Sequence, residues 1–151
     1  MTMRRIVVGA SVAAMLAVSI GVSAASAGPE ASAQRAVVLR TSLTGAAEAP
    51  GPGDPDGSGT AGILLQPRHD RVCWLLRVDG IELPALAAHI HVGAEGVPGP
   101  IVVTLGTPDE RGRSIGCTTS DVVDAIAANP SDYYVNVHTT SFPGGAVRGQ
   151  L

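Results

Sequence analysis

Three histidines, His89, His91 and His138, are the residues of this chain best suited to chemistry. His89 and His91 are one residue apart in a segment that we expect to be a strand, where side chains at i and i+2 point to the same face. His138 belongs to a second expected strand, 132–139, in which Asn136 shares its face. If these two strands are neighbours, the three imidazoles converge on one point.

Three imidazole ligands suit one copper or zinc ion, with a fourth position left for water or substrate. The alternative is that each histidine hydrogen-bonds a backbone carbonyl and fixes a loop. Both interpretations stay open at this point. His69 lies in a polar turn and is expected to be exposed, and the acidic pair Asp54 and Asp56 is expected to form a solvated turn, because it has too few ligands for Ca²⁺.

Other kinds of site find little support in the sequence. No serine lies in a Gly-x-Ser-x-Gly elbow, and no glycine-rich phosphate loop follows a strand, so we expect no catalytic residues. The chain has 151 residues with a net charge of −3, no basic cluster and only 3% aromatic residues. A nucleic-acid partner is therefore not expected, because there is neither a basic footprint nor a stacking platform.

The first 27 residues predict an exported protein. Arg4 and Arg5 form a positive start, 6–22 is an uncharged and largely apolar run, and the small residues at 25–27 are typical of a signal-peptidase site. An uncleaved membrane anchor is the alternative, but the run is short and diluted by glycine and serine. We expect cleavage after residue 27, a flexible lead-in over 28–35 and no stable membrane span afterwards. The expected location is secreted, or in the periplasm or cell envelope.

Cys73 and Cys117 are the two cysteines of the chain, and both follow the expected cleavage site. In an oxidising compartment such a pair is more often a disulfide than two free thiols. The bridge would close a loop of about 44 residues, which the chain-entropy account values at about 4 kcal/mol. A metal thiolate site is the alternative, although neither cysteine has the Cys-x-x-Cys spacing that such sites use.

The rest of the chain predicts a small all-β domain over 36–151. Short runs with alternating apolar residues, separated by Gly/Pro loops, predict seven strands. They cover 36–43, 60–66, 71–79, 87–92, 101–105, 132–139 and 146–151. A long loop is expected over 44–59. We expect an antiparallel, Greek-key-like β-sandwich or barrel, with the 71–79 strand directing Val72, Trp74, Leu76 and Val78 to the core.

One short helix is expected near residues 120–128. Thr119 or Ser120 is suited to cap it, and Val122, Val123 and Ile126 share one face. Asn129 and the proline that follows it end the pattern.

Three groups of residues, in the same order along the chain, resemble the CHRD domain, the module named after chordin. They are the Leu-Thr-Gly, Glu-Ala-Pro and Gly-Thr-Ala-Gly runs at 43–45, 48–50 and 59–62; the Ala-His-Ile-His run at 88–91 with the glycines that follow; and the closing runs at 134–139, 142–145 and 147–151. Together they cover essentially the whole chain after the expected signal peptide.

The resemblance implies a β-sandwich or barrel in a secreted protein. Among its motif positions, Glu48, Asn136 and Arg148 carry polar groups, while Ala146 stands where similar sequences often have an acidic residue. The cysteine-rich modules that accompany the domain in chordin are absent, so growth-factor binding is not expected.

Three functions remain as hypotheses. The first, which the lack of a catalytic constellation favours, is a non-enzymatic extracellular binding or structural module. The second is a protein that binds a single Cu or Zn ion through the three histidines. The third is a redox enzyme built on that same site.

Overall fold

The computed structural model describes residues 35–151, which form one antiparallel sheet of eight strands in the order β5-β4-β7-β8-β1-β2-β3-β6. The strands are β1 (Val37–Thr44), β2 (Ser58–Gln66), β3 (Arg71–Asp79), β4 (Ala87–Val92), β5 (Ile101–Leu105), β6 (Arg113–Thr119), β7 (Tyr133–His138) and β8 (Val147–Gln150). The expected signal peptide, 1–27, and nearly all of the lead-in lie outside the described residues.

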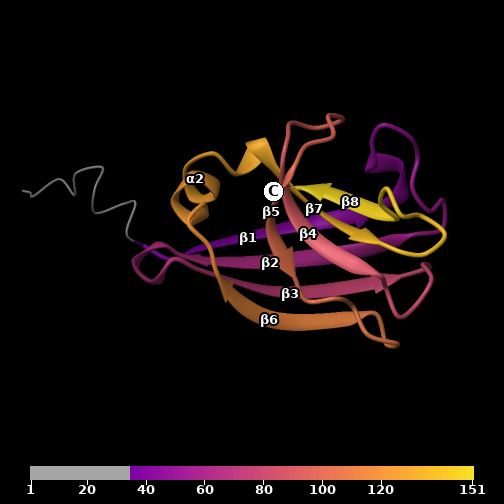
Figure 1. The fold of residues 1–151 in the computed structure, drawn as a ribbon, viewed down its shortest axis with the longest axis horizontal. Coiled ribbons are helices and arrows are strands. Elements are labelled where there is room, and N and C mark those ends of the chain that lie inside the picture. The colour runs from indigo at the N-terminus through magenta and orange to yellow at the C-terminus, as the bar shows by residue number, and fades with distance from the viewer. Residues whose placement is uncertain (1–34) are drawn as a thin grey trace, which may run out of the picture.

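The sheet curls on itself until it is almost a closed barrel. In Figure 1, β1, β2, β3 and β6 run side by side, while β4 and β5 cross them in another layer. The two edge strands are brought together by a side chain: Ser114 of β6 donates a hydrogen bond to the carbonyl of Gly106, just beyond β5, at 2.6 Å. The predicted all-β antiparallel class, with one short α-helix, is confirmed.

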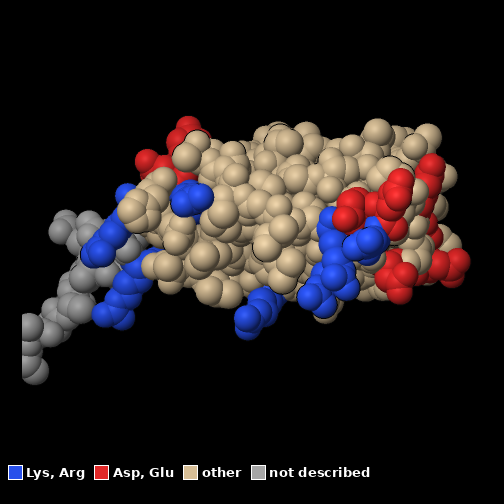
Figure 2. Space-filling model, turned by 90° about the horizontal axis from the view of Figure 1, so that it is seen from below, with Lys and Arg blue, Asp and Glu red and all other residues tan. Residues whose placement is uncertain are grey.

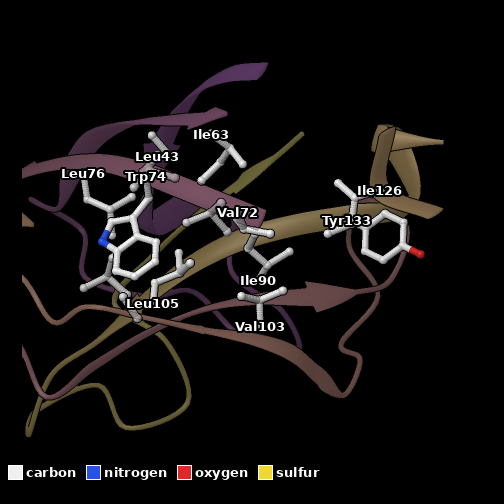
Figure 3. Packing of buried hydrophobic residues seen from close by; sticks show 14 of the residues in the cluster. Leu43, Ile63, Val72, Trp74, Leu76, Ile90, Val103, Leu105, Ile126 and Tyr133 are labelled. Carbon is white, nitrogen blue, oxygen red and sulfur yellow. The ribbon is translucent and has the colours of Figure 1, made fainter. Parts of the chain in front are cut away.

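The core lies between these layers, and strand alternation selects its residues. In β3, Val72, Trp74, Leu76 and Val78 are buried while Leu75 between them is exposed, as predicted. Figure 3 shows Trp74 and Val72 facing Ile90, Val103 and Leu105, which come from the opposite side of the barrel. One apolar face per strand is thus enough to fill the interior.

Strand β6 was not predicted, because its inward positions are small or polar. Ser114, Gly116 and Thr118 point inward, whereas Ile115, the most exposed large apolar residue described, points outward. Gly116 faces the indole of Trp74, and a Cβ there would come within 2.5 Å of the ring. The large tryptophan in β3 therefore requires small residues in β6, which removes the apolar alternation that identifies a strand.

The helix and the long loop differ from expectation only in detail. Helix α2 (Val123–Ala128) buries Val123 and Ile126 as predicted, but its N-cap position is Val122, which makes no side-chain capping bond. In the 44–59 segment, β1 continues through Thr44 and a 3-10 turn, η1, covers Gly45–Ala47. Among residues 35–151 no helix has the length and apolar character needed to cross a membrane.

The predicted disulfide is present. Cys73 and Cys117 face each other directly across the β3–β6 pair, and their sulfurs are bonded. No free cysteine remains, so the alternative of a metal thiolate site is excluded. The bridge lies on the outer face of the sheet, since Cys73 is half-buried and Cys117 is exposed.

Charged side chains are unevenly distributed over the surface. Figure 2 shows Asp and Glu gathered at two ends of the molecule, with a largely uncharged stretch between them. On the face that it shows, arginines lie singly or in small groups and form no continuous basic surface.

Replacing Ser114 by alanine is expected to destabilise the barrel by about 1–3 kcal/mol. The hydroxyl accepts a hydrogen bond from Trp74 Nε1 at 2.9 Å and donates to the Gly106 carbonyl, so its loss leaves two polar groups without partners. Urea unfolding measures the change. Ser42→Ala, at an exposed position of β1, is the matched control and should shift stability by less than about 0.5 kcal/mol. Equal effects in the two variants would contradict the bridging role of Ser114.

Candidate metal centre

Two adjacent strands bring the three predicted histidines together. β4 pairs with β7 in antiparallel register, with His89 opposite Asn136 and Ala87 opposite His138. Ile90 and Val135 occupy the core face of the pair, so the histidines lie on the other face. The hypothesis of neighbouring strands, on which the convergence depended, is therefore confirmed.

The imidazoles are close enough to share one metal ion. Each histidine offers one ring nitrogen, and these three atoms all lie within 4.8 Å of one another. The centroid of the His89 ring is 5.5 Å from that of His91 and 5.0 Å from that of His138. Zn–N bonds of about 2.0–2.1 Å place two ligand nitrogens of a tetrahedral ion roughly 3.4 Å apart, so small side-chain movements complete the set.

Two of the histidines are held by backbone carbonyls. Nδ1 of His91 lies 2.8 Å from the carbonyl oxygen of Gly99, and Nδ1 of His138 lies 3.0 Å from that of Pro143. A carbonyl only accepts, so in both rings Nδ1 carries the proton and Nε2 carries the lone pair. Metal-binding histidines are oriented in this way in proteins, with the second nitrogen donating to a carbonyl or carboxylate.

The most informative atom of the histidine cluster is Nε2 of His91. The atom is buried and has no hydrogen-bond partner. Buried polar atoms are nearly always paired, and each exception needs an explanation. The ring that carries this lone pair already has its proton on Nδ1, which is the tautomer that binds a metal through Nε2. A metal ion bound at this nitrogen would satisfy the lone pair, which no hydrogen bond from the described residues does.

His89 is the adaptable member of the cluster. Its Nδ1 lies 3.1 Å from Nε2 of His138, and with the lone pair on that Nε2 the donor is His89 Nδ1–H. His89 is half-buried, whereas His91 and His138 are 8% and 9% exposed. A metal bound by all three rings would therefore replace this hydrogen bond and change the tautomer or the orientation of His89, whereas His91 and His138 already have Nδ1 bonded to a carbonyl.

The pKa values of His89 and His138 are lowered, which favours their neutral imidazoles. Burial, together with the smaller effects of the neighbouring His138 and His91, lowers the pKa of His89 to about 4. Burial also lowers the pKa of His138, against a raising effect from the Pro143 carbonyl. Only neutral imidazole binds a metal, so lowered pKa values keep these two ligands available at neutral pH.

Acidification is expected to destabilise the metal-free protein. The unfolded chain takes up a proton at His89 near pH 6.5, but the folded protein does so only near pH 4. Between these values the unfolded state binds more protons, so the free energy of unfolding falls as the pH falls. Urea unfolding in EDTA from pH 7.5 to 4 should show a shallower fall for His89→Gln than for wild type. Parallel curves would contradict the lowered pKa.

Behind His91 lies a stack of three groups. The ring of Tyr134 is parallel to that of His91, with centroids 4.9 Å apart and an interplanar angle of 8°. The guanidinium carbon of Arg148 lies 3.4 Å from the centroid of the same tyrosine ring. Tyr134 is 3% exposed and its hydroxyl accepts a hydrogen bond from Gly99 N–H, so the loop that binds His91 is also fixed to the stack.

The three polar motif residues surround the cluster. Nε2 of His138 lies 3.0 Å from Oδ1 of Asn136, which is 2% exposed. An amide oxygen only accepts, so a lone pair on Nε2 requires the Asn136 amide to turn and present its N–H group there. Arg148 is opposite Asn136 in the β7–β8 pair and donates from Nη2 to the Ala94 carbonyl at 2.8 Å. An arginine at this position can either bind a backbone carbonyl or form an ion pair. This hydrogen bond is the first of these two roles.

Glu48 lies beside the loop that holds His138. Gly145 has a φ of +143°, which L side chains rarely adopt, and a Cβ there would meet the Glu48 carboxylate, so this position favours glycine. Burial raises the pKa of Glu48 to about 7, although Arg148 and the N–H of Ala49 act to lower it. Oε1 of Glu48 and Nη1 of Arg148 are both buried without a hydrogen-bond partner.

Sequence reasoning missed the groups that orient the ligands. The carbonyls of Gly99 and Pro143 belong to Gly/Pro loops, and a backbone oxygen has no sequence signature. The polar turns hold no comparable cluster among residues 35–151: His69 is exposed, and Asp54 Oδ1 accepts from the N–H of Asp56 as in an ordinary turn.

Comparison with known proteins agrees with the three motifs. Residues 39–151 match the CHRD domain family, from within β1 to the last residue. No curated protein and no solved structure matches the chain significantly. The matched region contains all three histidines, both cysteines and the three polar motif residues. The chain therefore belongs to the CHRD domain family.

Proposed function

We propose that this protein is an exported, non-enzymatic binding module that holds a single copper or zinc ion through His89, His91 and His138. The observation that carries the proposal is the buried Nε2 of His91, which has no partner and belongs to a ring already fixed in the tautomer of a ligand. A second ligand, His138, is oriented in the same way by a different loop.

The chemistry of the donor set supports copper or zinc over other ions. Neutral imidazole suits both metals, whereas Ca²⁺ and Mg²⁺ require oxygen ligands, and the cluster of described residues contains no carboxylate. Three protein ligands leave at least one coordination position for a group from solution. A bare hydrogen-bond network, the competing interpretation, accounts for the Nδ1 atoms of His91 and His138 but leaves the Nε2 of His91 unexplained.

Export is the second part of the proposal. The charged start, apolar run and small-residue site in 1–27 support it, and so does the Cys73–Cys117 disulfide, since such bridges persist in oxidising compartments. Mass spectrometry of the protein recovered from the culture medium or the cell envelope tests it. The expected N-terminus is Gly28, and a chain that keeps Met1 in the cytoplasm would contradict it.

Titration calorimetry with Cu²⁺ and with Zn²⁺ tests the metal site. One ion should bind per chain, and an ion present at 100 times its Kd should stabilise the fold by about 2.7 kcal/mol in thermal melts. The matched control is His69→Ala, which removes an exposed histidine outside the cluster and should change neither result. Absence of binding by both metals would contradict the proposal.

A further inference from the structure

The metal centre carries an unusual balance of charge. All three ligands are neutral imidazoles, and no carboxylate belongs to the cluster, so a divalent ion bound there would keep its full charge. Most protein sites offset this charge with thiolate or carboxylate ligands. Any compensation has to come from outside the ligand set.

A fixed positive charge adds to this imbalance. The Arg148 side chain is 1% exposed and lies on the ring of Tyr134, whose parallel neighbour is the ligand His91. Its guanidinium is therefore one aromatic ring away from the centre, in a region where solvent screens little. Nη2 donates to the Ala94 carbonyl and to Oε1 of Gln150, which are both neutral, and Nη1 has no hydrogen-bond partner.

Glu48, the acidic side chain that interacts with Arg148, neutralises the charge of the guanidinium only in part. Arg148 lowers the pKa of Glu48, but burial outweighs it and leaves that pKa at about 7. Near neutral pH a substantial fraction of the Glu48 carboxyl groups is thus uncharged. No hydrogen bond joins Oε1 of Glu48 to the guanidinium.

The centre is also accessible on one side. His89 is half-buried while the other two ligands are buried, so the cluster opens toward solvent beside His89. Among residues 35–151, only these three side chains form the ligand group. A fourth ligand therefore comes from solution and enters beside His89.

We propose that the open coordination position selects a small monoanion, and that Arg148 supplies part of this preference through its charge. The inference rests on the proposed metal site. The guanidinium lies about 8 Å from the His91 ring through Tyr134, and an anion on the metal lies farther out. Coulomb attraction over roughly 10 Å at an effective dielectric constant of about 20 corresponds to roughly tenfold in affinity.

The test uses the purified protein loaded with one equivalent of Cu²⁺, with azide as the anion and imidazole as a neutral ligand. Azide should give a new near-ultraviolet charge-transfer band and a changed electron paramagnetic resonance spectrum, and it should bind more tightly than imidazole. Failure of Cu²⁺ to bind would overturn the metal site itself. Normal Cu²⁺ binding with no response to azide, or with imidazole preferred, would overturn only the present inference.

Two variants test the role of Arg148. Arg148→Met should weaken azide binding roughly tenfold and leave imidazole binding unchanged, whereas Arg148→Lys, which keeps the charge, should restore most of the azide affinity. Equal azide affinity in both variants would show that the charge has no part in selection. If Arg148→Met does not fold, Arg148→Gln, which is also neutral, takes its place, and azide affinity equal to that of Arg148→Lys would again overturn the role of the charge.

Discussion

Replacing His138 by alanine is expected to abolish tight binding of Cu²⁺ or Zn²⁺. Loss of a group that only supports a metal ligand typically costs 10–100-fold in affinity, and His138 is a direct ligand in the proposed site, so the loss should exceed this range. His138 is also the member that links the cluster, because its Nε2 lies beside both Asn136 and His89. Titration calorimetry at pH 7.5 measures the change.

The three histidines should not respond equally. His91 and His138 are held in ligand tautomers by loop carbonyls, so their alanine variants lose prepared ligands. His89 is half-buried and must reorient, and water can take its place. We therefore expect His89→Ala to lose less affinity than either of the others. The reverse order would contradict the assignment of His89 as the adaptable ligand.

Some loss of stability accompanies these substitutions and has to be separated from loss of binding. Unfolding in EDTA gives the stability of each metal-free variant, and the added stability at saturating metal gives the binding term. His69→Ala again serves as the control, since its ring is exposed. If His138→Ala kept wild-type affinity while remaining folded, the three-histidine site would be wrong.

Removing the disulfide is expected to be the largest change in stability available outside the core. Cys73 and Cys117 are 44 residues apart in the chain. The chain-entropy account therefore assigns about 4 kcal/mol to the bridge through its constraint on the unfolded state. Because Cys117 is exposed, the double variant Cys73→Ala/Cys117→Ala opens no large cavity, and the loss reports mainly on the unfolded chain.

Urea unfolding of the double variant and of reduced wild type measures this contribution. The two should agree, because both lack the same constraint. For a domain of this size a loss of about 4 kcal/mol lowers the melting temperature by roughly 10–20 °C. A loss below about 1 kcal/mol would show that residual β3–β6 pairing persists in the unfolded chain and restricts it as much as the disulfide does.

The proposed export bears on the proposed metal site, because it sets where the protein meets its metal. An exported protein meets its metal outside the cytoplasm, unless it is exported already folded. The disulfide and the histidine centre lie on different strand pairs, β3–β6 and β4–β7, so oxidation and metal loading are expected to be separate events.

Much of the fold was predictable because local alternation records which face of a strand is buried. The bounds of β3, β4 and β5 agree with prediction, and the remaining predicted strands differ by one or two residues at their ends. β6 was missed for a reason of packing: its inward residues are small because Trp74, from another strand, fills the space. A residue 42 positions away thus decided the pattern at Gly116.

The features of the candidate site likewise fall into those that follow from the sequence and those that follow only from the tertiary structure. The sequence alone determined the ligand types, the shared face of His89 and His91, the family and the pair of cysteines, because each depends on residue identity or on strand geometry within a few positions. Only the tertiary structure decided that β4 and β7 are neighbours, that the carbonyls of Gly99 and Pro143 bind His91 and His138, and that Arg148 lies behind Tyr134. These facts depend on strand pairing and on the course of loops, which are set by contacts between distant parts of the chain. Three histidines in a sequence therefore suggest a metal, but it is the two carbonyls and the unpaired nitrogen of His91 that support one.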